Sequence, residues 1–143
     1  MPEQTHSSIV IQAAPAAIMR VIADVEDYGE WISGVDQVVV HAKDEQDRPL
    51  SATFHGSMGL IRDSYTVDYD WADTEVSWWL TKGEALKDLH GTYRCTDRAD
   101  GGTDVEYRLD VELAVPMVSM LRKRGEKMIV DSALKGLKRR VEG

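Results

Sequence analysis

The best candidate for acid–base chemistry in this sequence is Asp63, which lies in a segment of alternating side chains. Counting by twos along Ile61–Trp71 places Asp63 on the same side of a strand as Tyr65. A carboxyl group at the wall of an apolar cavity has its pKa raised by desolvation, so it can act as a general acid or base beside a phenol. We therefore take Asp63, Tyr65 and Tyr93 as candidate catalytic residues. The alternative for Asp63 is solvent exposure or an ion pair with Arg62.

A second group of residues consists of large rings, methionines and small helical residues that could enclose an apolar ligand. Small residues on the inward arc of the C-terminal helical pattern, Gly125, Ser132 and Gly136, leave volume that a ligand could fill. The alternative is that the rings simply fill a core. The candidate ligand-binding residues are Trp31, Phe54, Met58, Tyr65, Trp78, Tyr93, Tyr107, Leu121, Gly125, Met128 and Ser132.

Metal and phosphate chemistry find little support in the sequence. The four histidines are scattered, without a second His, Asp or Glu at helical ligand spacing, and the single cysteine, Cys95, excludes a thiolate zinc site. Gly56-Ser57-Met58-Gly59 lacks the lysine of a phosphate-binding loop. We therefore expect neither a metal site nor a cofactor.

The periodicity of the chain changes twice, which indicates the order of its elements. A β-branched run ends near Ile11, and two helical segments follow, Pro15–Ala23 and Val25–Trp31. From position 34 to 113 the apolar period is two, and beyond Pro116 it returns to about 3.6 for some 25 residues. The remaining strands are expected at 35–41, 51–57, 61–71, 76–80, 86–95 and 105–113.

These elements predict one α+β domain over residues 1–143. Seven strands with one polar face each form an antiparallel sheet whose apolar face needs a cover. The C-terminal helix is the only element long enough to cover it, so we expect a curved sheet wrapped around that helix, with two short helices between the first two strands. The apolar share of 43% supplies a core.

Charge is unevenly distributed along the chain. The formal net charge is −8, which on average repels nucleic acid, so no nucleic-acid partner is expected. The segment from Val115 to Gly143, however, holds eight basic and three acidic residues. We expect a cytoplasmic protein without stable membrane insertion, because there is neither a signal-peptide pattern nor an apolar stretch of about 20 residues. The oligomeric state is open.

The sequence resembles the START-like (SRPBCC, helix-grip) superfamily, in particular its polyketide cyclase/dehydrase and coenzyme Q-binding-protein-like branch. This resemblance covers nearly the whole chain and implies a deep apolar cavity between sheet and helix. Relatives of this kind carry lipids, quinones or polyketide-like molecules, or catalyse reactions on them. The matching segments are Ile9–Ile11 with Ala14-Pro15, Asp24–Trp31, Ile61–Tyr65, Val76–Trp78, Leu86-Lys87, Gly91–Tyr93 and Val115–Met117.

Three functions are compatible with these features. The first is binding or transport of a hydrophobic small molecule such as a polyketide, quinone or lipid, which needs no catalytic group. The second is a polyketide cyclase or dehydratase in which Asp63 and a tyrosine move protons. The third is a protein- or membrane-interaction module that uses the basic face of the C-terminal helix, including Lys123, Arg124 and Lys127.

Overall fold

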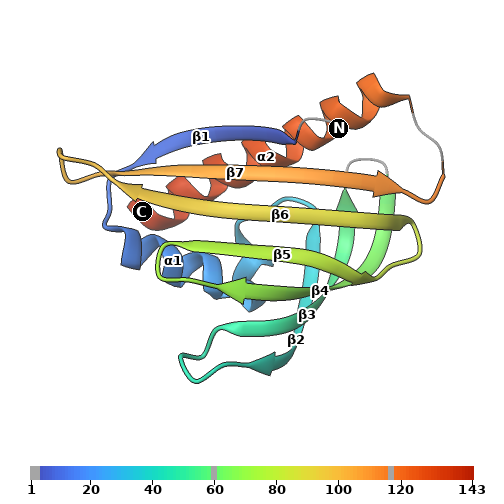
Figure 1. The fold of residues 1–143 in the computed structure, drawn as a ribbon, viewed down its shortest axis with the longest axis horizontal. Coiled ribbons are helices and arrows are strands. Elements are labelled where there is room, and N and C mark those ends of the chain that lie inside the picture. The colour runs from blue at the N-terminus through green and yellow to red at the C-terminus, as the bar shows by residue number, and fades with distance from the viewer. Residues whose placement is uncertain (1–3, 59–60, 116–117) are drawn as a thin grey trace.

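Seven antiparallel strands form one open, curved sheet in the order β1-β7-β6-β5-β4-β3-β2, and the long helix α2 runs along its concave side (Figure 1). The computed structural model describes residues 4–58, 61–115 and 118–143. The elements are β1 (Thr5–Ile11), α1 (Pro15–Ala23), the 3₁₀ helix η1 (Val25–Glu30), β2 (Val35–Lys43), β3 (Pro49–Met58), β4 (Ile61–Trp71), β5 (Glu75–Lys82), β6 (Leu86–Asp97), β7 (Thr103–Leu113) and α2 (Ser119–Glu142).

Local sequence explains where the short helices begin and what they bury. Pro15 occupies the first turn of α1, where its missing N–H is not needed. Ile18, Met19 and Ile22 follow at helical spacing, and all three are buried. The predicted pair of short helices between the first two strands is therefore confirmed.

Alternation in the strands sets the two faces of the sheet. Along β7 every second residue from Val105 to Val111 is buried, and the residues between them are exposed or half-buried. The pairing of β2 with β3 contains register shifts, between Val35 and Gln37 and again around Ala42. Such irregularities bend a strand, so they help to curl this end of the sheet toward α2.

Helix α2 packs against β1, β7 and α1, and its buried face differs from the one predicted. The buried residues are Glu126, Val130, Ala133, Leu134, Gly136 and Leu137. The predicted inward arc, which also took in Leu121 and Met128, shares Gly136 with this face, whereas Leu121, Met128 and Ser132 are exposed. Our expectation was wrong because a buried carboxylate, Glu126, interrupts the apolar periodicity on which it rested.

Glu126 and Arg122 join α2 to the edge of β7. The carboxylate of Glu126 accepts hydrogen bonds from Thr5 Oγ1 and from the backbone N–H of Val111, both at 2.7 Å. Arg122 donates from Nη1 to the carbonyl oxygen of Val111 at 3.3 Å. Strand β1 pairs with β7 only as far as Leu109, so these two side chains take the place of a strand partner at Val111.

Candidate ligand-binding cavity

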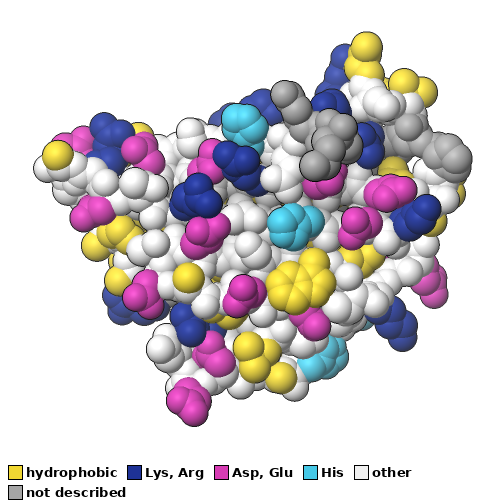
Figure 2. Space-filling view, in the orientation of Figure 1, with side chains coloured by type: hydrophobic (Ala, Val, Ile, Leu, Met, Phe, Trp, Pro, Cys, Tyr) yellow, Lys and Arg dark blue, Asp and Glu magenta, His cyan; other side chains and the backbone are white. Residues whose placement is uncertain are grey.

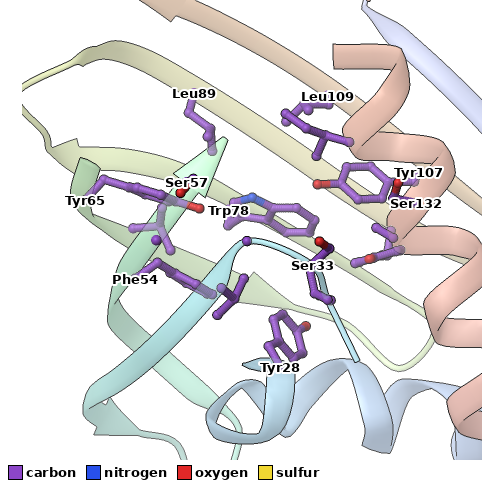
Figure 3. A pocket seen from close by; sticks show the side chains of 18 of the residues that line it. Tyr28, Ser33, Phe54, Ser57, Tyr65, Trp78, Leu89, Tyr107, Leu109 and Ser132 are labelled. Atoms are coloured by element: carbon purple, nitrogen blue, oxygen red, sulfur yellow. The ribbon is translucent and has the colours of Figure 1, made fainter. Parts of the chain in front are cut away.

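A cavity of about 380 Å³ lies between α2, the concave face of the sheet and the segment that joins η1 to β2 (Figure 3). It forms because α2 packs along β1 and β7 at one side of the sheet and leaves the central strands uncovered. Four of its lining residues are exposed and mark its mouth: Ser33, Ser57, Met128 and Ser132.

The sheet side of the cavity is a wall of aromatic rings. The rings of Phe54 and Tyr65, on neighbouring strands, stack with centroids 5.5 Å apart. The indole of Trp78 lies 5.4 Å from the ring of Tyr93 and 5.7 Å from that of Tyr107. Figure 3 shows Tyr65, Trp78 and Tyr107 directed into the space between the sheet and α2. Contacts of this kind hold each ring in place, so the wall is largely preformed.

Gly91 allows the indole of Trp78 to lie flat against strand β6. The two residues are register partners on β5 and β6. A Cβ atom at position 91 would lie only 2.3 Å from the indole carbons Cε2 and Cζ2. Only glycine permits this close approach of a ring to the backbone, so Gly91 sets the position of the cavity floor.

Five polar groups in the wall have no hydrogen-bond partner within the parts of the chain that the structure describes. They are the hydroxyls of Tyr65, Tyr69, Tyr93 and Tyr107 and the indole N–H of Trp78, all on residues that line the cavity. These atoms are open to water in the cavity, since Arg122 Nε is the only fully buried side-chain nitrogen or oxygen without a partner among the described residues. Tyr28 differs, because its hydroxyl donates to the carbonyl oxygen of Ile22. The free groups are all able to donate, so the wall presents several donors to an occupant.

Burial keeps these phenols protonated. Desolvation is the main cause that raises the pKa of Tyr65, Tyr69, Tyr93 and Tyr107 above the ordinary 10.0, and nearby ionisable groups raise it further. No Asp, Glu, Lys or Arg occurs among the described residues of the wall. His55 contributes to the wall, but its Nδ1 pairs with the hydroxyl of Ser64 at an exposed position. The described wall therefore contains no carboxylate, ammonium or guanidinium group.

The raised tyrosine pKa values predict a loss of stability in alkali. All five tyrosines of the chain, including Tyr28, have a raised pKa in the folded protein. Above pH 10 the unfolded chain loses phenolic protons that the folded chain keeps, so the free energy of unfolding falls as pH rises. We expect tyrosinate absorbance to appear together with the loss of far-ultraviolet circular dichroism. Ionisation of several tyrosines in the folded protein would contradict this.

Asp63, a predicted catalytic residue, is not among the residues that line the cavity, and its carboxylate binds backbone groups. Its Oδ1 accepts from the N–H of Ser64 at 2.8 Å, and its Oδ2 accepts from the N–H groups of Ala85 and Leu86, both at 3.2 Å. The carboxylate thus ties the start of β4 to the turn before β6. Besides desolvation, its nearby charge raises the pKa of Tyr65, but the carboxylate itself binds backbone donors rather than the phenol.

Replacing Asp63 with asparagine tests this structural role. The amide nitrogen of Asp63→Asn cannot accept from Ala85 and Leu86, so we expect a loss of about 1–3 kcal/mol in the free energy of unfolding with ligand affinity unchanged. Urea denaturation and dye binding measure the two effects. Asp70→Asn, at an exposed position on the same strand, is the matched control and should match the wild type. Loss of ligand affinity without loss of stability would show that Asp63 acts in the binding site rather than in holding the fold.

The structure brings seven of the predicted ligand-binding residues together at the cavity: Phe54, Tyr65, Trp78, Tyr93, Tyr107, Met128 and Ser132. Trp31, Leu121 and Gly125 are not part of the wall. A Cβ atom at position 136 would lie 2.6 Å from the carbonyl oxygen of Trp31. The space beside Gly136 is therefore filled by Trp31 and is not available to a ligand. Around Gly125 the space is open. The side chain of Met58 lies outside the described residues.

The cavity also has lining residues that the sequence analysis did not select, including Tyr28, Ser33, Ser57 and Tyr69. Tyr69 shares the alternation of Tyr65 and could have been found by extending the same count along β4. Ser33 and Ser57 lie near the ends of β2 and β3, where no periodic signal singles them out.

No group of three or more potential metal ligands occurs in the described parts of the chain. Likewise, none of the described helices is both long and apolar enough to span a bilayer.

Solved structures from bacteria share the fold across nearly their full length. A START superfamily protein from Mycobacterium smegmatis is 17% identical, with a TM-score of 0.90, 99% of this chain covered and 98% of that one. A protein from Thermus thermophilus is 20% identical, with a TM-score of 0.84 and coverage of 98% and 97%. An aromatase/cyclase, ZhuI, from a Streptomyces species is 11% identical, with a TM-score of 0.80 and coverage of 98% and 93%.

No curated protein sequence matches the chain significantly. A family model does match, and its span of residues 3–142 takes in every element described above. The α+β helix-grip fold predicted from the sequence is confirmed by the structural neighbours. The chain belongs to the START-like family described as polyketide cyclase / dehydrase and lipid transport.

Proposed function

We propose that the protein binds and carries a neutral, ring-bearing molecule that has several carbonyl or hydroxyl oxygens, such as a quinone or a polyketide-like compound. The observation that supports this proposal is the set of unpartnered donors on the ring wall. An occupant that displaces water from these donors without accepting from them leaves each donor unsatisfied at a cost of about 1–3 kcal/mol, so an occupant that supplies acceptors is favoured over one that does not.

The size and polarity of the cavity support the same ligand class. Its volume of about 380 Å³ lies within the range of small-molecule pockets, about 300–1,000 Å³. Flat rings match the stacked rings of Phe54 and Tyr65 in the wall. A carboxylate or phosphate headgroup would enter a wall that has no cation among its described residues, and burial of an unpaired charge is strongly unfavourable.

Carriage is favoured over acid–base catalysis by the protonation state of the wall. Phenols with raised pKa values are poor proton donors and are not available as bases near neutral pH. Asp63, the carboxylate considered for this role, is held by backbone N–H groups elsewhere. The wall therefore suits recognition by hydrogen-bond donation better than proton transfer.

Competition between naphthoquinone and naphthalene for a neutral dye, Nile red, tests the proposal. The two rings have nearly the same shape, but only the quinone has acceptors. A hydrogen bond contributes about 0.5–1.5 kcal/mol, so we expect the quinone to bind at least about two-fold more tightly. The preference should decrease in Tyr93→Phe/Tyr107→Phe, which removes two of the five donors, and should be unchanged in Tyr28→Phe, whose hydroxyl is engaged by Ile22. Equal affinities for both rings in the wild type would refute the donor argument.

A further inference from the structure

The start of α2 and the segment just before it expose an unusual number of large apolar side chains. Val115, Val118, Met120, Leu121 and Met128 are between 55% and 71% exposed. Single exposed apolar residues are normal on a protein surface, but a contiguous group marks an interaction site. We call Val115 together with Val118–Arg124 the α2 tip.

The fold leaves the α2 tip without a partner among the described residues. Figure 1 shows the first turns of α2 extending past the end of β1, and in Figure 2 apolar and basic side chains gather at that end of the molecule. The first contacts that fix the helix to the sheet come from Arg122 and Glu126, which bind Val111. The apolar side chains before them therefore face solvent.

Basic residues adjoin these apolar side chains. Arg122, Lys123 and Arg124 are consecutive, and no acidic residue lies between Val118 and Arg124. Lys123 and Arg124 are exposed and form no ion pair within the described segments. Salt screens charges more than about 8–10 Å apart, so this local positive charge, rather than the net −8 of the chain, governs what approaches the tip.

We propose that the α2 tip docks on the surface of a membrane that contains anionic lipid. Protruding apolar side chains beside cations match the two layers of such a surface, the acyl boundary and the charged headgroups. A protein partner would need a matching pocket for each protruding side chain, whereas a fluid bilayer accepts them without one. A symmetric dimer through the tip would place Lys123 and Arg124 of one copy against those of the other, which is repulsive.

The tip is continuous with the mouth of the cavity. Leu121, Gly125, Met128 and Ser132 follow one another at intervals of about one helical turn, and they share one face of α2. Met128 and Ser132 line the cavity and are exposed at its mouth. Docking through the tip thus brings the cavity mouth close to the lipid surface, where an apolar ligand would be exchanged.

Flotation with phospholipid vesicles tests the docking proposal. We expect the protein to bind vesicles of phosphatidylcholine with phosphatidylglycerol, and to bind pure phosphatidylcholine more weakly. A surface lysine or arginine contributes about five-fold to such binding, so Lys123→Gln/Arg124→Gln should lower the partition coefficient more than about ten-fold. Val118→Ser/Met120→Ser should lower it by a similar factor through lost apolar burial, and serine at position 118 is a favourable N-cap.

Matched controls separate docking from general charge and from the cavity. Lys135→Gln/Arg139→Gln removes the same charge from exposed positions toward the other end of α2 and should leave vesicle binding unchanged. Tyr93→Phe/Tyr107→Phe, which alters only the cavity, should also float like the wild type. The proposal is overturned if the wild type fails to float with anionic vesicles, or if both charge variants lose binding equally. It is also overturned if Val118→Ser/Met120→Ser instead abolishes a dimer in sedimentation.

Discussion

Replacing Gly91 with alanine is expected to weaken binding of Nile red or naphthoquinone by at least about ten-fold. The new Cβ would lie 2.3 Å from the indole carbons of Trp78, far inside van der Waals contact. The indole must then move away from β6, and the cavity is the open space beside it. Overpacking of this kind also lowers the free energy of unfolding by about 1–3 kcal/mol, so binding is measured well below the melting temperature.

Two further variants distinguish displacement of the indole from a general loss of stability. Gly91→Ala/Trp78→Leu removes the ring that the new methyl group meets, so stability should recover in part. Gly125→Ala introduces the same methyl group where space is open and should bind ligand like the wild type, with a helix stabilised by up to about 1 kcal/mol. If Gly91→Ala bound ligand normally, the indole could not form the cavity floor.

Replacing Glu126 with alanine is expected to produce the largest loss of stability, about 3–5 kcal/mol. The buried carboxylate accepts from the hydroxyl of Thr5 and from the N–H of Val111, and hydrogen bonds to a charged group contribute about 1.5–3 kcal/mol each. Urea denaturation measures the loss.

Glutamine at position 126 keeps one acceptor oxygen, so Glu126→Gln should lose about half as much stability and remain folded for comparison. Glu112→Gln removes an exposed carboxylate that pairs with Lys87, and it should change the free energy of unfolding by less than about 1 kcal/mol. A value for Glu126→Ala within about 1 kcal/mol of the wild type would show that α2 is held by its apolar face alone.

The sheet was predictable from the sequence because its signal is local. Alternation in β4 and β7 assigns each residue to a face without knowledge of its partners, so Tyr65, Trp78, Tyr93 and Tyr107 were placed inward from the count alone. The predicted seven strands, two short helices and one long helix are those that form.

The orientation of α2 was not predictable in the same way. Its buried face includes Glu126, which is there because Val111 and Thr5 supply donors from strands far away in the chain. Helical periodicity counts Glu126 as a polar residue and assigns it to the outer face. The predicted inner face therefore lies toward Met128 and Ser132. Those two residues border the cavity mouth, and the volume arises from the path of the helix rather than from small side chains.

Asp63 illustrates a related limit. Alternation gives the face of a residue, and in β4 it puts Asp63 on the side of Tyr65, but it does not reveal what the side chain binds. The donors that hold the carboxylate, the N–H groups of Ala85 and Leu86, come from a turn more than 20 residues later. Because such partners depend on tertiary structure, a sequence pattern alone cannot separate a structural carboxylate from a catalytic one.

Native mass spectrometry of the freshly purified protein, with organic extraction of whatever it retains, tests the central claim that the ring-lined cavity holds a small molecule. We expect a complex with one neutral, oxygen-bearing ring compound, or one-to-one uptake of added naphthoquinone that Gly91→Ala prevents. A protein that shows only its own mass, takes up no quinone and gives no saturable Nile red signal would contradict it.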